Sequence, residues 1–321
     1  MKTRSLLQAL FVALFVSIVA CVACGGGGGS TAGGTTPSAT STEASQPNMT
    51  KTYPIHLHPH AHVGDRVQVV FDAFEDNGTI MHLASSGQEI SSEHKTKRSH
   101  LEGVMTTVAL DARQDDLHDT LEVKTLTIDD RVILQNKRVD VTKARKADDA
   151  ILMVDGAPAT PELRKALKDL LDLRVGGPTD DEIFGTTQPQ LAGAHWPLNG
   201  ELARADLAED QGADVTSTTI SGETTFVGIK HVGNLDALEM KAEMHIDGIK
   251  VPLPQPGATS EPGQAKATMT KLVPVDENRG VLESHMAFEM TMRIHVPTKT
   301  GDSVIGDITA TSRRDDQTTS F

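Results

Sequence analysis

Four histidines alternate with other residues in one short segment of the chain. They are His56, His58, His60 and His62. Side chains alternate along an extended chain, so the four imidazoles are expected on one side at intervals of about 6.6 to 7 Å. Imidazole binds Zn(II), Cu(II) and Ni(II), and neighbouring members of the series can share such an ion. The spacing therefore permits a divalent metal site, and the alternative is a solvated polar edge strand.

No other set of residues points to a reaction. The glycine run at 25–29 lacks the Gly-Lys-Ser/Thr ending of a phosphate loop. The chain has neither a Gly-x-Ser-x-Gly nucleophile elbow nor a His-Glu-x-x-His metal pair. The charge clusters at 180–182 and 313–316 are expected to be solvated surface. We therefore predict no catalytic residue and no cofactor-binding residue, and we interpret the protein as a non-enzyme.

Composition narrows the range of partners. The 321 residues carry 30 basic and 44 acidic side chains, a net charge of -14, which argues against a nucleic-acid partner. Aromatic residues make up only 3% of the chain, and Tyr53 and Trp196 are the only tyrosine and tryptophan. Because sugar-binding sites use aromatic platforms, a glycan ligand is not expected, and Trp196 is expected to pack in the body.

The first twenty residues predict a secretory signal peptide. Lys2 and Arg4 precede an uncharged, mostly apolar run at 5–20. This run is shorter than the roughly 20 apolar residues that a membrane-spanning helix needs. We expect residues 1–20 to be cleaved.

Both cysteines lie at the end of the apolar run. The sequence Ile18-Val19-Ala20-Cys21 resembles the lipobox of bacterial lipoproteins, and Cys24 offers a second register. The resemblance implies that Cys21, or alternatively Cys24, is acylated, for example with palmitate, and becomes the mature amino terminus. An ordinary cleaved signal is the other interpretation. No aspartate follows either cysteine, which favours the outer membrane over the inner one under the enterobacterial sorting rule and leaves the periplasmic or surface side open.

A flexible tether and a β-rich body are expected to follow. Residues 21–50 are rich in Gly, Ser, Thr, Ala and Pro, so they predict a leash with a reach of about 25 to 30 Å. Short alternating runs then predict antiparallel strands, and Asn77-Gly78 predicts the turn of a hairpin between 67–71 and 79–83. The remaining runs predicted as strands are 104–110, 121–128, 131–135, 216–220, 224–229, 237–246, 267–273, 280–296 and 303–311.

One amphipathic helix is expected inside this β-rich body. Thr160 and Pro161 are a cap residue and a first-turn proline, leucines follow with helical spacing, and Gly176-Gly177-Pro178 ends the segment. The helix is expected to cover one face of a sheet, or to act as a movable lid over an apolar cavity.

A weak internal sequence similarity, called here the internal echo, suggests how the body is organised. Residues 103–107 and 121–129 resemble 222–225 and 238–247, at offsets of 117 to 119 residues. The fold class is therefore expected to be mainly β, half-barrel-like or a sandwich, with two related halves at 51–155 and 196–321. The helix and its connection at 156–195 would separate these halves.

These features favour a cell-envelope protein with a binding or scaffold role. A curved sheet beneath an amphipathic helix could enclose an apolar ligand, similar to the half-barrel lipoproteins that handle lipids. Docking to another envelope protein is the second mechanism, and metal binding through the histidine segment is the alternative class of function.

Overall fold

The structure is a computed structural model. It describes residues 51–57, 61–111, 116–211, 215–250, 253, 256–276, 279–297 and 303–320. The signal peptide, Cys21, Cys24 and the tether lie outside these residues, as do His58 and His60.

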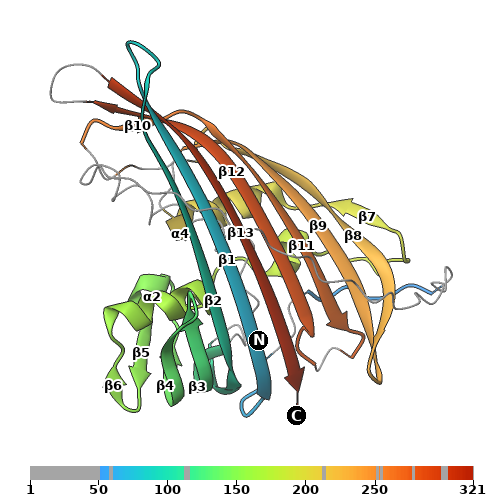
Figure 1. Ribbon diagram of the computed structural model, residues 1–321. Helices are drawn as coiled ribbons and strands as arrows, with labels where there is room; N and C mark the ends of the chain where they lie inside the picture. The colour runs from blue at the N-terminus through green and yellow to red at the C-terminus, as the bar shows by residue number, and fades with distance from the viewer. Residues whose placement is uncertain are drawn as a thin grey trace.

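The body is one antiparallel sheet of 13 strands, so the predicted mainly β fold class is confirmed (Figure 1). The strands follow the order β6-β5-β4-β3-β2-β1-β13-β12-β11-β9-β8-β7, and β10 pairs separately with β12. The first half of the chain runs outward from the centre of the sheet, and the second half runs back inward. The first and last strands, β1 and β13, are therefore neighbours.

The strands alternate between a buried and an exposed face. In β12 the even-numbered residues from Ser284 to Ile294 are buried, and most odd-numbered ones are exposed, as expected for a sheet with one covered face. The strand bounds are β1 Arg66–Leu83, β2 Glu89–Leu110, β3 Asp116–Ile128, β4 Arg131–Thr142, β5 Ile151–Val154, β6 Ala157–Pro158, β7 His195–Pro197, β8 Thr219–Val232, β9 Leu235–Ile249, β10 Thr259–Ser260, β11 Gly263–Pro274, β12 Glu283–Pro297 and β13 Ser303–Ser320.

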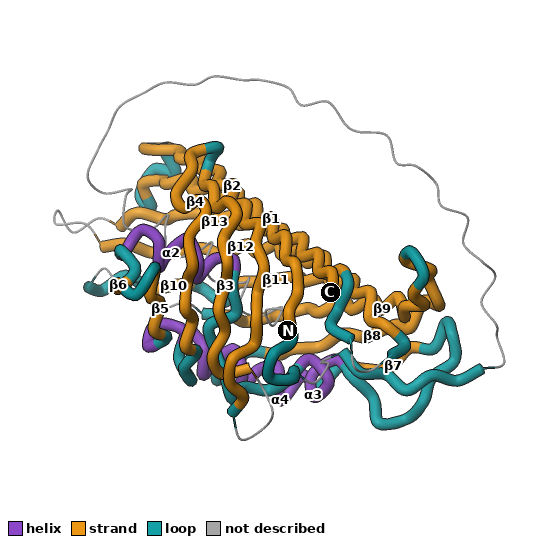
Figure 2. Tube along the Cα trace, turned by 90° about the horizontal axis from the view of Figure 1, so that it is seen from below, coloured by secondary structure: helices purple, strands orange, loops and turns teal. Residues whose placement is uncertain are grey.

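The helices α2 (Pro161–Leu170), α3 (Asp180–Phe184) and α4 (Gly200–Gln211) lie against the same face of the sheet (Figure 2). Helix α2 is the predicted one. Thr160 caps it by accepting a hydrogen bond from the Leu163 backbone N–H at 3.3 Å, and Pro161 occupies the first turn. A single 3-10 turn, η1 (Ala147–Asp149), precedes β5.

The predicted hairpin at Asn77-Gly78 is wrong. Both residues lie inside β1, which continues without a turn to Leu83. Asn77 pairs with Lys95 on one side and Ala310 on the other. A two-residue turn of the predicted type needs positive φ at both positions, and neither residue has it. Pairing on both edges of the strand overrides the local turn signal.

The buried apolar side chains form two large clusters on the helix-covered face. The first lobe lies between β1–β5 and α2, and the second lobe lies between β8–β13, α3, α4 and the segment at 53–57. The border runs between β1, which carries Val69 and Phe71 of the first lobe, and β13, which carries Ile308 and Ala310 of the second. The two sequence segments of the internal echo form neighbouring pairs, β2 with β3 and β8 with β9. Their duplication stays a prediction.

Candidate functional site

Methionines line the inner face of the second lobe. Six of its 26 buried apolar residues are methionine, against one of 17 in the first lobe. We call the six the methionine surface; its members are Met240, Met244, Met269, Met286, Met290 and Met292. They lie on the neighbouring strands β9, β11 and β12. Methionine is unbranched and polarisable, so such a surface can adapt its shape to an apolar partner.

Small residues stand beside these methionines. Met244 pairs across the strands with Ala267, and Met290 pairs with both Ala265 and Ala310. Methionine and alanine are therefore neighbours in these two rows of the inner face, whereas Met269 pairs with Met286.

The cover over the methionine surface consists of several short pieces. From the extended segment at 53–57, Ile55 and Leu57 reach the core. The five-residue helix α3 contributes Ile183 and Phe184, and α4 contributes two further residues to the same cluster. Several polar contacts hold these pieces. Tyr53 and Gln190 exchange two backbone hydrogen bonds, and Asp180 of α3 pairs with Lys271 of β11. The Leu57 N–H donates to Asp181 Oδ1 at 2.6 Å, and Trp196 Nε1 donates to the Phe184 carbonyl at 2.9 Å.

Trp196 therefore packs in the body, as predicted, because it is half-buried against the second lobe. Tyr53 meets Phe226 edge to face, with ring centroids 5.8 Å apart. The two helices α3 and α4 were not predicted. The sequence contained a signal that could have predicted the start of α3, because Thr179 and Glu182 form a capping box. For α4, Asn199 Oδ1 accepts a hydrogen bond from the Leu202 N–H at 3.2 Å.

A belt of charged and polar side chains, all buried except the partly exposed Lys97, crosses the inner face near the border of the lobes. We call it the polar belt; its members are Glu75, Lys97, Asp169, Asp180, Lys271, Ser284, Arg314 and Asp316. Six of these residues come from the sheet, while Asp169 lies on α2 and Asp180 on α3. Each lobe therefore has a helix joined to the sheet by an ion pair of the belt.

The expectation that residues 180–182 and 313–316 are solvated is wrong for three of them. Asp180 is buried and pairs with Lys271, whose side chain is 0% exposed. Arg314 and Asp316 are buried on the inner face, and Arg314 Nε donates to Asp316 Oδ1 at 2.6 Å. Alternation along β13 sends every second residue of the charge cluster inward. These buried charges persist because each has a partner.

Lys97 links the centre of the sheet to α2. Its Nζ hydrogen-bonds to Asp169 and lies 3.7 Å from Glu75 Oε1. Burial lowers the pKa of Lys97, but the negative charges of Asp169 and Glu75 outweigh that effect and raise the pKa above its ordinary value. The ammonium therefore stays charged although it is only 19% exposed.

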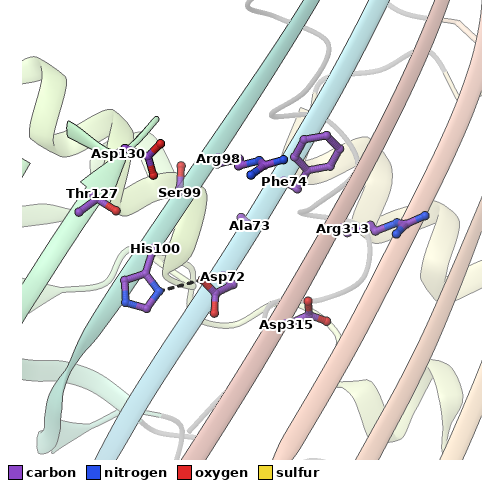
Figure 3. A pocket seen from close by; sticks show the side chains of 10 residues that line it. All are labelled: Asp72, Ala73, Phe74, Arg98, Ser99, His100, Thr127, Asp130, Arg313 and Asp315. Carbon is purple, nitrogen blue, oxygen red and sulfur yellow. Dashed lines mark hydrogen bonds and ion pairs between the residues drawn. The ribbon is translucent and has the colours of Figure 1, made fainter. Parts of the chain in front are cut away.

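The opposite, outer face carries a shallow pocket of about 490 Å³ over β2, β1 and β13 (Figure 3). Arg98 lies over the ring of Phe74, 5.7 Å from its centroid, and His100 Nδ1 is 2.8 Å from Asp72 Oδ1. Both signs of charge line this pocket, so it has no single electrostatic preference.

Several histidines of the described strands and turns lie next to a carboxylate. Most of these pairs join different strands, and His245 with Glu243 is a pair within β9. In the strands and turns that the structure describes, these pairs include His82–Asp307, His94–Asp76, His100–Asp72, His231–Asp236, His245–Glu243, His285–Asp315 and His295–Glu261.

The predicted metal ligands are only partly described. His56 and His62 are exposed, and His62 Nδ1 lies 3.4 Å from Asp65 Oδ2. Among the described residues, no three His, Cys, Asp or Glu side chains are grouped so that they could hold a metal ion. Because His58 and His60 fall outside that part of the chain, the metal hypothesis stays a prediction.

No known protein family and no curated protein matches the chain. Several solved structures show a distant likeness. The crystal structure of OccK11 (OpdR) from Pseudomonas aeruginosa is 7% identical, covers 81% of this chain and 98% of its own, and has a TM-score of 0.20. OpdQ and OccK7 (OpdD) from the same organism are each 7% identical, cover 80% of this chain and 98% and 99% of their own, and have TM-scores of 0.18 and 0.19. Such low scores carry no argument about function. In the described part of the chain, no helix has the length and apolarity to cross a membrane.

Proposed function

We propose that this protein is a lipid-anchored cell-envelope protein that binds an apolar ligand between the methionine surface and its cover. The observation that carries the proposal is the concentration of methionine, set beside alanine, on one inner face of three neighbouring strands. Methionine also fills irregular gaps in structural cores, as Met105 does in the first lobe. A surface that must fit a chain of variable shape gains from the flexibility of methionine.

The composition of the cover supports the same function. A ligand can reach the methionine surface only if part of the cover separates from the sheet. The segment at 53–57 is held by two backbone hydrogen bonds between Tyr53 and Gln190 and by the Leu57 N–H bond to Asp181. Helix α3 is also fixed to the sheet by the buried Asp180–Lys271 ion pair, so the segment at 53–57 is the piece that can separate at lower free energy. The lid is therefore assigned to the second lobe, while α2 covers the first lobe as a structural element.

The amino-terminal anchor is part of the proposal. Acylation of Cys21, or of Cys24 in the second register, would hold the body at a bilayer through its tether, with the outer membrane favoured. Labelling of cells with radioactive palmitate tests it. Loss of label in Cys21→Ser with retention in Cys24→Ser would assign the site, the reverse result would assign Cys24, and an unlabelled wild-type chain would contradict the anchor.

Ligand binding is tested on the full chain extracted from membranes in mild detergent. Native mass spectrometry should detect a co-purifying apolar molecule, and organic extraction should release it for identification. We expect adducts on the wild-type chain and several-fold fewer on a variant with Met286→Gln and Met290→Gln. Absence of any adduct across repeated preparations would overturn the binding function and favour docking to an envelope protein.

Metal binding through the histidine segment is the second candidate. It is supported by the exposure of His56 and His62, which leaves both imidazoles accessible. Zn, Cu and Ni contents of chelator-free protein should fall when His56, His58, His60 and His62 are all changed to Ala. Equal metal content in the two proteins would end this candidate.

A further inference from the structure

The polar belt places hydrogen-bond donors at one end of the methionine surface. Ser284 is the first buried inner-face residue of β12, between Asp316 of β13 and Lys271 of β11. Arg314 lies one inner-face position further along β13, opposite Met286. The belt and the methionine surface therefore meet on β12.

Two of these donors are buried without a partner. Ser284 Oγ and Arg314 Nη1 each have less than 1 Å² of exposed surface and no hydrogen-bond partner among the described residues. Arg314 uses its Nε on Asp316, and its guanidinium lies over the ring of Phe71, 5.1 Å from the centroid. Buried polar atoms are nearly always paired in proteins, so two neighbouring unpaired donors call for an explanation.

An apolar path leads away from these donors. Beyond Ser284, the inner side of β12 consists only of apolar residues, namely Met286, Phe288, Met290, Met292 and Ile294. The eight residue steps from 286 to 294 span about 27 Å at 3.4 Å per residue. A single lipid chain could lie along this path with its polar end at Ser284 and Arg314.

The charges of the belt decide which polar end fits. The belt holds three cations, Lys97, Lys271 and Arg314, and four carboxylates, so its net charge is -1. An additional buried anion would raise the negative excess and would lose its hydration. An uncharged acceptor such as an ester or amide carbonyl accepts both hydrogen bonds without this penalty.

We propose that Ser284 Oγ and Arg314 Nη1 bind the uncharged carbonyl of an ester- or amide-linked lipid whose chain lies along the inner face of β12. The assignment rests on the proposed apolar-ligand function and adds to it the chemistry and the orientation of the ligand. It predicts discrimination against free fatty acids, although their chains are equally apolar.

Three probes with matched chains test the assignment. The full chain in detergent is offered an equimolar mixture of methyl oleate, oleate and 1-octadecene at pH 8, and native mass spectrometry counts the adducts. These probes carry an uncharged ester, a carboxylate and no head group, respectively. We expect the methyl oleate adduct to exceed each of the others about tenfold, as two hydrogen bonds imply.

Single substitutions test which residues produce the preference for methyl oleate. Ser284→Ala removes one hydroxyl with little risk to folding and should lower the preference for methyl oleate over octadecene about threefold. Arg314→Met should remove the rest, provided that circular dichroism shows a folded chain. Thr224→Val is the matched control, because Thr224 Oγ1 is also buried and unpaired but lies on β8, away from the belt. The control should keep the full preference.

The possible results separate the two levels of the proposal. Equal binding of methyl oleate and octadecene, or stronger binding of oleate, would overturn the head-group assignment while leaving the apolar-ligand function standing. Adducts of none of the three probes would overturn the proposed function itself. Equal losses in Ser284→Ala and Thr224→Val would show that the two β12–β13 donors are not the site.

Discussion

The two lobes of this sheet share one backbone architecture and differ in how their interiors are filled. In the first lobe, Leu and Val supply 13 of the 17 buried apolar residues, and one ten-residue helix covers them. In the second lobe, Leu, Ile and Val together supply 12 of 26, Met supplies 6 and Ala 5, and the cover is assembled from short pieces.

This difference separates rigidity from adaptability within one domain. The contrast lies in methionine, which is unbranched, has three rotatable side-chain bonds and adapts to more arrangements than leucine. The sheet hydrogen bonds are the same in kind on both sides of the β1–β13 junction. The choice of side chain therefore assigns a structural role to the first lobe and supports a binding role for the second. Four predictions test this comparison.

The largest effect is expected from the buried ion pair of the second lobe. Lys271→Met leaves Asp180 as a buried carboxylate without its lysine, which should cost about 3–5 kcal/mol of unfolding free energy. Urea denaturation measures the loss. Adding Asp180→Leu to Lys271→Met should recover much of it, and a double variant as unstable as the single one would contradict the explanation.

The same ion-pair prediction has a counterpart in the first lobe. Lys97→Met should cost less, because its ammonium is 19% exposed while that of Lys271 is 0% exposed. Its pH dependence has a definite sign. The pKa of Lys97 is raised in the folded state, so its stabilisation is complete below the unfolded pKa of about 10.4. The stabilisation disappears as the pH rises through the higher folded pKa. The difference in stability between wild type and Lys97→Met should therefore be constant from pH 7 to 9 and shrink above pH 10.5.

The second prediction concerns the leucine packing of the first lobe. Leu167→Ala on α2 deletes a fully buried side chain and should cost about 3 kcal/mol, within the range of 2–5 kcal/mol for such changes. Binding of an apolar ligand in the second lobe should stay unchanged when it is measured on the folded fraction. Loss of ligand with preserved folding would show that the lobes are not independent.

The third prediction expects the opposite in the second lobe, namely a small loss of stability and a large loss of ligand binding. Met286→Leu and Met290→Leu, made singly, conserve volume and should each cost less than about 1.5 kcal/mol. Each should nevertheless lower ligand adducts several-fold in native mass spectrometry, because leucine is less able to adapt its shape. Met105→Leu in the first lobe is the matched control and should leave the adducts unchanged. Full binding by both second-lobe variants would remove the special role of methionine.

The sequence predicted the local patterns of this fold better than its long-range pairings. Helix α2 was readable because Thr160 and Pro161 mark its start within a few residues. Asn77-Gly78 carried an equally local signal and was misleading, because pairing on both sides of β1 decides the conformation there.

The burial of the charged residues could not be predicted from the sequence either, because it also depends on long-range pairing. Asp180 and Lys271 are 91 residues apart, so nothing near Asp180 in the sequence reveals its partner. The unpaired donors Ser284 Oγ and Arg314 Nη1 likewise lie near each other only because β12 pairs with β13. Only alternation along β13 could have suggested that half of the 313–316 cluster points inward.

The smallest expected effect concerns the helix caps of the two lobes. Thr160→Ala removes the cap of α2, and Thr179→Ala removes the side-chain half of the capping box of α3; each should cost about 1 kcal/mol. The consequences should differ. Helix α2 is ten residues long and remains held by its buried leucines, so amide exchange within it should rise only slightly. Helix α3 has five residues and depends more on its cap, so its amides should exchange clearly faster and ligand uptake should accelerate. Equal exchange in the two variants would mean that the cover of the second lobe is as firmly held as that of the first, and the contrast between the lobes would then rest on their methionines alone.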